Sequence, residues 1–240
     1  MLLSVIVPSY NEAEILKRTL PELYAYLKTL PWDFELIVGN DGSKDATEST
    51  IKNFAKGKRN VRYVGYAQNR GKGAILTECF KTATGDIQLF IDADLTIEKT
   101  LIPVLVGALK KGDISIASKH LRGAKVAYPL VRRITSNGYG LLTRLLFGVP
   151  LKDFQCGLKA FKKEVIRDLL PGTVNQRFLW DTEILVKAFR KHYKIVEIPA
   201  VVHPAGRSSV HVLRDTFRMF RGLLALRLNG PHQVRKRAQV

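Results

Sequence analysis

Two acidic side chains separated by one residue, Asp92 and Asp94, follow the apolar run 87–91. An apolar run of this length predicts a buried strand, which puts both carboxylates at its carboxyl end. Such a pair can hold one divalent cation, because Mg²⁺ and Mn²⁺ favour few carboxylates completed by water and substrate phosphate oxygens. Asp-x-Asp sequences also occur in solvated turns, so the pair by itself leaves a metal site and an ordinary turn as alternatives.

A third carboxylate, Asp41, follows a second predicted strand at 34–39. In that position a carboxylate can accept the imide N–H of uracil or guanine. The alternative is a cap for the helix that follows, a role that Ser43 or Asp45 could fill equally well.

Two glycines and two cations begin a predicted helix at 71–83, in the stretch Asn69-Arg70-Gly71-Lys72-Gly73-Ala74. Backbone N–H groups and cations at a helix start suit a pyrophosphate, with Lys72 as the expected contact. The spacing fits neither the P-loop nor the G-x-G-x-x-G pattern, so an ordinary glycine-rich turn is the alternative.

Predicted strands and helices alternate through the first half of the chain. Further strands are predicted at 4–8, 61–66 and 114–118, and a helix with apolar residues three and four apart at 15–27. This order predicts an α/β fold with a doubly wound, mostly parallel sheet and flanking helices. Ligands of such sheets bind beyond the carboxyl ends of the strands, where the polar positions 9–12, 41, 92 and 94 all fall. The sequence therefore predicts one site at that edge.

The second half of the chain is less regular. It contains predicted helices at 129–147, 162–170 and 180–192, a strand at 195–202, and a final helix at 210–228. No segment rich in Gly, Pro or Ser divides it. We therefore predict one catalytic domain, residues 1–209, followed by an amphipathic helix and a basic tail, residues 210–240.

The composition limits the class of protein. The chain has 240 residues, 46% of them hydrophobic, which is enough for one sizeable core. Its two cysteines lack C-x-x-C spacing, so we expect neither a zinc site nor a disulfide framework, and a reducing compartment fits best. The first residues read as a strand and not as a signal peptide, and no run approaches about 18 apolar residues. We therefore expect a cytoplasmic protein that does not cross a membrane.

The net charge of +18 is concentrated in one half of the chain. Residues 1–110 contain 14 basic and 13 acidic side chains, whereas residues 111–240 contain 25 basic and 8 acidic ones. This asymmetry predicts an anionic partner such as lipid head groups, phosphates or nucleic acid. A solubility surface or a thermophile's charge network is the alternative, but such a network would carry both signs.

Four motifs follow one another along the first half: Ile6-Val7-Pro8-Ser9-Tyr10-Asn11-Glu12, Asn40-Asp41-Gly42-Ser43-Lys44-Asp45-Ala46-Thr47, Arg70-Gly71-Lys72-Gly73 and Asp92-Ala93-Asp94-Leu95. Together they resemble the inverting glycosyltransferase family 2, which implies the GT-A fold as a single domain. Three later motifs are similar to its dolichyl-phosphate mannose and dolichyl-phosphate glucose synthase branch: Asp153-Phe154-Gln155-Cys156-Gly157-Leu158-Lys159-Ala160-Phe161, Trp180-Asp181-Thr182-Glu183-Ile184-Leu185 and Glu197-Ile198-Pro199.

The resemblance implies roles for individual residues. The nucleoside would be held by Pro8, Tyr10, Glu12 and Asp41. The metal, Mg²⁺ or Mn²⁺, and the diphosphate would be held by Asp92 and Asp94. The implied reaction is inverting transfer of a hexose from GDP-mannose or UDP-glucose to a polyprenyl, dolichyl-type phosphate. Thr96 and Lys119 replace residues common in the mannose branch. The resemblance therefore does not fix the sugar or the nucleotide base of the donor.

A phosphate acceptor needs cations more than a base, because its second pKa is about 6 and it is largely dianionic at neutral pH. Cations also stabilise the charge that develops on the leaving diphosphate. The candidates for the acceptor phosphate are Lys119, Arg122, Arg132, Arg133 and Arg207. Lys119 and Arg133, together with Asp94, are our candidates for direct participation in catalysis.

Three other functions are alternatives, and one of them is a nucleotidyltransferase, which could also use the carboxylate pair. A transferase acting on a hydroxyl of a sugar or lipid would need a general base, for which Asp181 at a predicted helix start is the candidate; a helix cap is its ordinary role. A nucleic-acid-binding protein is suggested by the charge alone, and the sequence lacks every motif of that class. We therefore expect no nucleic-acid partner.

The predicted helix at 210–228 carries an apolar stripe flanked by arginines. The stripe consists of Val210, Leu213, Phe217, Phe220, Leu224 and Leu228. A helix of this kind suits the plane of an anionic bilayer, so we expect peripheral binding to the cytoplasmic face of a membrane. Packing of the stripe against the domain's own core is the alternative.

Overall fold

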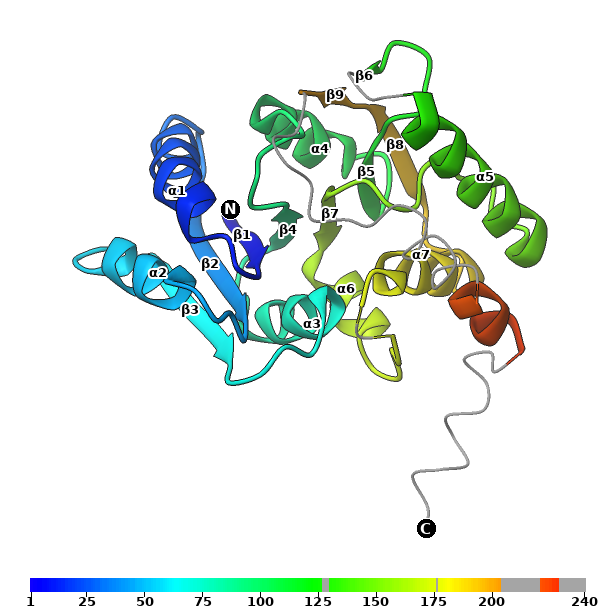
Figure 1. Cartoon of the computed structure of the whole chain (residues 1–240). Coiled ribbons are helices and arrows are strands. Elements are labelled where there is room, and N and C mark those ends of the chain that lie inside the picture. Colours follow the sequence, from blue (N-terminus) through cyan, green and yellow to red (C-terminus); the bar gives the residue numbers. More distant parts are fainter. Residues whose placement is uncertain (127–129, 176, 204–220, 229–240) are drawn as a thin grey trace.

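A seven-stranded sheet forms the centre of the computed structural model, which describes residues 1–126, 130–175, 177–203 and 221–228, without the side chains of 130–134 (Figure 1). The strand order is β3-β2-β1-β4-β7-β5-β8. The strands are β1 (Leu2–Ser9), β2 (Asp33–Asp41), β3 (Val61–Tyr66), β4 (Ile87–Ile91), β5 (Ile114–Ser118), β7 (Leu158–Lys162) and β8 (Ile195–Pro199). A second, two-stranded sheet pairs β6 (Lys125–Val126) with β9 (Val201–Val202).

Helices cover both faces of the large sheet (Figure 1). They are α1 (Ala13–Leu27), α2 (Thr47–Ala55), α3 (Lys72–Thr82), α4 (Ile102–Ala108), α5 (Leu130–Phe147), α6 (Lys163–Leu169) and α7 (Leu179–Arg190), with a short 3₁₀ turn at Lys99–Leu101. The five strands predicted for the first half are all present, and the mostly parallel α/β sheet is confirmed. The predicted strand 195–202 is divided into β8 and β9.

Strand β7, which was not predicted from the sequence, runs antiparallel between β4 and β5. This strand has only five residues, and a lysine, Lys159, lies among its apolar residues. That lysine is fully buried, and its ammonium is neutralised by Asp181 of α7 at 2.5 Å. A charged residue in a short segment hides the apolar pattern from which a strand is predicted.

Two hydrophobic layers lie on the two faces of the sheet because successive strand residues point to opposite sides. On β1, Val5 and Val7 pack with residues of α1 and α4, whereas Ile6 packs on the other side. The layer around Ile6 contains residues of α3, α5, α6 and α7, including the stacked rings of Phe80 and Trp180. A sheet covered on both faces leaves the strand ends as the place for polar ligand-binding groups.

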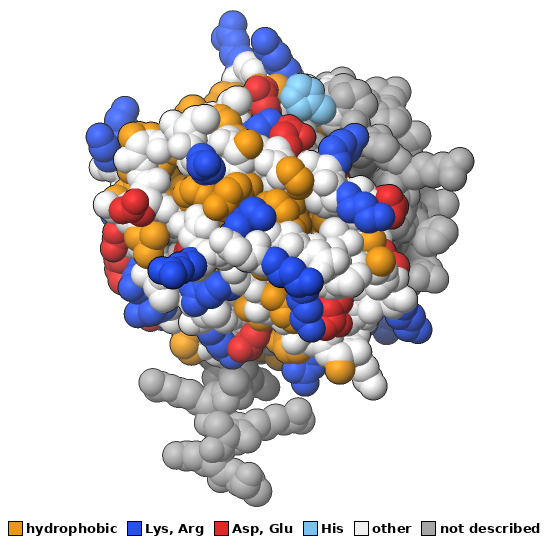
Figure 2. Space-filling view, turned by 90° about the vertical axis from the view of Figure 1, so that its left-hand side faces the viewer, with side chains coloured by type: hydrophobic (Ala, Val, Ile, Leu, Met, Phe, Trp, Pro, Cys, Tyr) orange, Lys and Arg blue, Asp and Glu red, His pale blue; other side chains and the backbone are white. Residues whose placement is uncertain are grey.

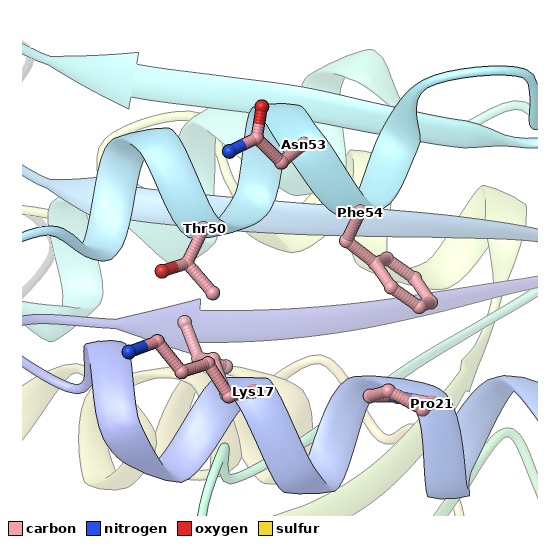
Figure 3. Close-up of a pocket in the computed structure, with 6 residues that line it drawn as sticks. Lys17, Pro21, Thr50, Asn53 and Phe54 are labelled. Carbon is pink, nitrogen blue, oxygen red and sulfur yellow. The ribbon is translucent and has the colours of Figure 1, made fainter.

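The face formed by α1 and α2 is mixed in charge. Figure 2, which views this side, shows Lys and Arg side chains dispersed among acidic and apolar ones, as the near balance of charge in residues 1–110 predicts. A groove of about 250 Å³ lies between the two helices and is lined by Leu16, Lys17, Pro21, Thr50, Asn53 and Phe54 (Figure 3). None of these residues belongs to the predicted site.

Residues 221–228 are helical, and residues 204–220 and 229–240 lie outside the described part of the chain. Leu223 and Leu226 are buried in the layer around Ile6, whereas Leu224 and Leu228 are exposed. Most of the predicted amphipathic helix, and the division at residue 209, therefore stay predictions. None of the described helices is long and apolar enough to span a bilayer.

Candidate active site

The carboxyl ends of β1, β2 and β4 meet at one edge of the sheet, since β1 pairs in parallel with both of the others. The loops after β1 and β2 are bonded together there. The N–H of Asn11 donates to Ser43 Oγ at 2.9 Å, and the N–H of Lys44 donates to Asn11 Oδ1 at 2.8 Å. Asn11 has a φ of 54°, a left-handed conformation that asparagine tolerates better than most residues. The predicted gathering of the polar clusters at one edge is confirmed.

The predicted nucleoside residues of the first motif lie at this edge. Pro8 is buried opposite Gly39 in the β1–β2 register, and Tyr10 is exposed at the end of β1. The N–H of Glu12 donates to Thr47 Oγ1 at 2.9 Å, which holds Glu12 near the beginning of α2. Burial, and after it the charges of the nearby carboxylates of Asp92 and Asp94, raise the pKa of the Glu12 carboxyl to about 7. Three carboxyl groups from two loops are therefore close enough to interact.

The Asp92 carboxylate lies between Lys72 and Gly157. Lys72 Nζ donates to Asp92 Oδ1 at 2.5 Å, and the Asp92 N–H donates to the carbonyl of Gly157 at 3.0 Å. A Cβ atom at position 157 would lie 1.8 Å from Asp92 Oδ2. Only glycine leaves room for the carboxylate, which gives Gly157 a physical role in the 153–161 motif.

The neighbouring Asp94 accepts the N–H of Thr96 through Oδ1 at 3.0 Å. This short-range bond forms a turn after β4, in which Leu95 has a φ of 49°. The turn keeps the Asp94 carboxylate near Glu12, as the effect of its charge on the pKa of Glu12 shows. Asp92 and Asp94 therefore face a common region.

These residues fit a hard divalent cation. The ammonium of Lys72 already binds Asp92, so this carboxylate is positioned to bind positive charge, and the carboxyl oxygens are the donors that Mg²⁺ and Mn²⁺ prefer. Within the described ranges, no group of three or more His, Cys, Asp or Glu side chains is arranged to hold a metal. Asp92 and Asp94 would therefore need water and phosphate oxygens to complete the coordination.

Lys72, predicted to contact the diphosphate, begins α3 beside the predicted metal ligands. Burial lowers the pKa of Lys72, but the charges of Asp92 and Asp181 outweigh this effect and raise it above its usual value. The lysine is therefore a permanent cation at this edge of the sheet.

Asp41 organises the turn before α3. Its Oδ2 accepts Asn69 Nδ2 and the N–H of Gly71, and its Oδ1 accepts the N–H of Arg70, all at 2.8 Å. Gly71 has a φ of 110°, which only glycine adopts easily. A carboxylate has about four acceptor positions, so about one is left for a base N–H. The base-binding role of Asp41 stays a prediction.

Asp41 does not cap α2, the helix that follows it in the chain. At the beginning of α2, the N–H of Thr47 donates to Asp45 Oδ1 at 3.0 Å. Its Oδ2 accepts the N–H of Ala13 at 3.1 Å, which ties the beginnings of α1 and α2 together.

Asp181, the predicted base of the alternative reaction, is buried. Its Oδ1 is 2.5 Å from Lys159 Nζ, which also donates to the carbonyl of Cys156 at 2.6 Å. Lys159 and Lys72 both lie at the ring of Phe90, 5.1 and 5.3 Å from its centre. Asp181 is therefore one member of a set of alternating charges, of which Lys159 and Asp181 are buried and Lys72 and Asp92 are partly exposed.

Two of the five cations predicted for the acceptor phosphate can be placed. The backbone N–H of Lys119 donates to Asp153 Oδ2 at 2.9 Å, and its ammonium is 3.6 Å from the same oxygen. Arg122 is exposed in the turn before β6. The side chains of Arg132 and Arg133, on α5, and residue Arg207 lie outside the described part of the chain.

Asp153 and Gln155, which belong to the 153–161 motif and had no predicted role, make contacts that organise the site. Asp153 is buried and bonds Lys119. Gln155 Nε2 donates to Thr182 Oγ1 at 2.8 Å and contacts Tyr139 Oη at 3.4 Å, which joins α5 and α7. Nothing in the local sequence indicates these partners, because they come from segments far apart in the chain.

Replacement of Gly157 by alanine is expected to displace the Asp92 carboxylate and weaken Mn²⁺ binding. Lost support of a ligand weakens metal affinity by about 10- to 100-fold. Calorimetry with Mn²⁺ in the presence of UDP measures this effect. Gly107→Ala is the control, because a Cβ at position 107 meets no atom within 4 Å. Equal affinities of the two variants would contradict the role of Gly157.

Glu12→Gln is expected to change how stability depends on pH in protein kept metal-free with EDTA. The folded-state pKa of Glu12 is about 7 against an ordinary 4.5, so the folded protein retains this proton between the two values. Stability is then lost as pH rises from about 4.5 to 7, by at most about 3 kcal/mol. Urea unfolding at pH 5 and 8 measures the loss.

The glutamine variant should lack that loss of stability, whereas Glu14→Gln, at an exposed position, should keep it. The same pH dependence in wild type and Glu12→Gln would show that the carboxyl is not protonated in the folded state.

Comparison with known proteins identifies the family of the chain. Residues 4–170 match the family model described as Glycosyl transferase family 2. The chain is 32% identical over 220 residues to the glycosyltransferase AglD of Haloferax volcanii, covering 90% of this chain and 35% of that protein. It is 28% identical to the dolichyl-phosphate beta-glucosyltransferase of Saccharomyces cerevisiae, covering 94% of this chain and 74% of that one. It is 32% identical to the dolichol-phosphate mannosyltransferase of Pyrococcus furiosus, covering 83% and 56%.

Among solved structures, glucosyl-3-phosphoglycerate synthase from Mycobacterium tuberculosis, in complex with Mn²⁺, UDP and glucosyl-3-phosphoglycerate, has a TM-score of 0.69. The two chains are 21% identical, and the match covers 94% of this chain and 79% of that one. This likeness confirms the GT-A fold. The family match extends over more than half of the chain, so the protein belongs to glycosyl transferase family 2.

Proposed function

We propose that this chain transfers a hexose, with inversion, from GDP-mannose or UDP-glucose to a polyprenyl phosphate of the dolichyl type. The proposal is carried by the gathering of Asp92, Asp94, Glu12 and Lys72 at one sheet edge beside the turn that Asp41 holds. It is supported by relatives named for dolichyl-phosphate glucose and mannose transfer. The chain spans 35% of the Haloferax relative and 56% of the Pyrococcus one, which both continue beyond the matched region.

The site residues would act on the leaving diphosphate. A divalent cation held by Asp92 and Asp94 would neutralise charge on the diphosphate as the bond to the sugar breaks. Lys72, bonded to Asp92, adds a fixed positive charge at the same place. Glu12 and Asp41 would position the nucleoside. A dianionic acceptor phosphate would attack without a base, oriented by cations such as Lys119 and Arg133.

The surroundings of Asp181 favour a phosphate acceptor over a hydroxyl acceptor. A general base must reach the proton that it removes. Asp181 is buried, and one of its oxygens is bound by the Lys159 ammonium. The carboxylate is better explained as the partner of a buried lysine, because removal of either charge would leave the other unpaired.

We further propose that the chain works at the cytoplasmic face of an anionic membrane. On α5, Leu141 and Leu145 lie one turn apart and are exposed, Leu145 to 74%. Leu224 and Leu228 are likewise exposed on the helical segment 221–228. Exposed leucines in the half of the chain with the large basic excess suit insertion among anionic head groups.

The acceptor is tested by supplying labelled UDP-glucose or GDP-mannose with Mg²⁺ or Mn²⁺ and either a polyprenyl phosphate or the matching polyprenol. Label is expected in lipid only with the phosphate. Asp92→Asn should lower the rate on the order of a hundredfold or more, because the metal and leaving-group stabilisation is lost. EDTA should stop the wild type. Transfer to the polyprenol, or full activity in EDTA, would overturn the proposal.

The membrane contact is tested by co-sedimentation with anionic vesicles at low salt. The double variant Leu141→Ser/Leu145→Ser is expected to weaken binding by about tenfold or more, since two leucines lose apolar burial. Val104→Ser, at an exposed position on α4, is the matched control. Truncation at residue 209 is less informative, because Leu223 and Leu226 belong to the core. Failure of the wild type to bind vesicles would contradict the proposal.

A further inference from the structure

The connection between α6 and α7, residues 173–175 and 177–178, is fastened to α7 by a buried carboxylate. Glu183 is 2% exposed. Its Oε1 accepts the N–H of Val174 at 3.0 Å, and its Oε2 accepts the N–H and the Nδ2 of Asn175 at 2.8 and 2.6 Å. Three hydrogen bonds to an ionised acceptor are among the stronger ties available to a loop.

A buried lysine one turn further along α7 reinforces this fastening. Lys187 Nζ donates to Thr173 Oγ1 at 2.9 Å and to the carbonyl of Pro171 at 2.8 Å, and also to the carbonyl of Leu169. Glu183 and Lys187, on successive turns of α7, thus both bind residues 173–175 of the connection.

The end of the connection next to α7, at Phe178, is bound by Gln155. Gln155 Nε2 donates to the carbonyl of Phe178 at 3.2 Å. Gln155 belongs to the segment that also contains Gly157, which touches Asp92. The connection is therefore tied to the region around the predicted metal site.

Between these ties the connection packs on the first turn of α3. A Cβ at Gly73 would lie 2.9 Å from the carbonyl oxygen of Asn175 and 2.4 Å from Trp180 Cβ. Figure 1 shows the chain between α6 and α7 passing beside α3. Gly73 lies two residues after Gly71, whose N–H binds Asp41. The close approach thus brings the connection to the predicted nucleotide site.

Arg177 is the cation of this connection and is exposed. Among the described residues, its guanidinium has no hydrogen-bond or ion-pair partner. Burial raises the pKa of Asp41, and the N–H groups of Arg70 and Gly71 and the charge of Arg177 oppose this effect. Arg177 is therefore near enough to Asp41 for the two charges to interact.

We propose that the α6–α7 connection forms one wall of the donor-nucleotide pocket. In this pocket Arg177 binds the nucleoside diphosphate of the donor, and Glu183 is a positioning residue that holds Arg177 in place. A guanidinium suits this role because it pairs with phosphate oxygens in a fixed geometry. The inference rests on the proposed function, since it assigns further residues to that function's donor.

The test is calorimetric titration of UDP and of GDP, with Mn²⁺ present, into the full chain. Arg177→Gln is expected to raise the dissociation constant of the nucleotide that binds by about tenfold, the loss of one charge-assisted bond. Arg167→Gln, an exposed arginine on α6, should leave it unchanged. Unchanged affinity in Arg177→Gln, with tight binding by the wild type, would overturn this inference alone. Absence of nucleotide binding by the wild type would overturn the proposed function as well.

The positioning role of Glu183 is tested with Glu183→Gln, whose amide can no longer accept all three N–H groups. We expect a rise in the dissociation constant and in the donor KM, with kcat and the acceptor KM unchanged. Glu164→Gln on α6 is the control.

The double variant Arg177→Gln/Glu183→Gln should lose no more affinity than Arg177→Gln, because Glu183 acts through Arg177. Additive losses, or a fall in kcat alone, would show that Glu183 does not position Arg177.

Discussion

The contact between Lys72 and Asp92 is the interaction on which the site depends. It joins the beginning of α3 to the end of β4, and the 2.5 Å bond fixes one carboxylate oxygen while Gly157 closes against the other. A partly buried carboxylate needs compensating charge, so its position is set by where a cation can reach. The Gly71 turn, held by Asp41, begins the helix at the point from which Lys72 makes this bond.

Charge balance explains why this edge suits a cation. Lys159 and Asp181 neutralise one another in the core, and Lys72 neutralises Asp92. Among the described residues Glu12 forms no ion pair, and burial together with the two neighbouring carboxylates raises its pKa to about 7. A bound divalent cation would relieve this repulsion, so metal binding and the stability of the fold are linked.

The second half of the chain completes a site that the first half begins. The antiparallel strand β7 separates β4 from β5 and supplies the buried Lys159, and the glycine beside Asp92, Gly157, immediately precedes this strand. Glu183 of α7 accepts hydrogen bonds from the connection between α6 and α7, and this connection packs against α3. The exposed leucines of α5 belong to this half as well, so the second half contributes to the proposed donor site and contains the proposed acceptor cations and the proposed membrane surface.

The sequence by itself determined the alternation of strands and helices and the edge where Asp41, Asp92 and Asp94 gather. Apolar runs and helical spacing are local, and the carboxyl ends of parallel strands meet at one edge. It did not determine the place of β7 or the partners of charged residues. Lys159 reads as a surface lysine until Asp181, 22 residues away, is brought to it. Ion pairs and close approaches at glycine depend on distances between segments remote in sequence, and only packing of the whole chain decides those distances.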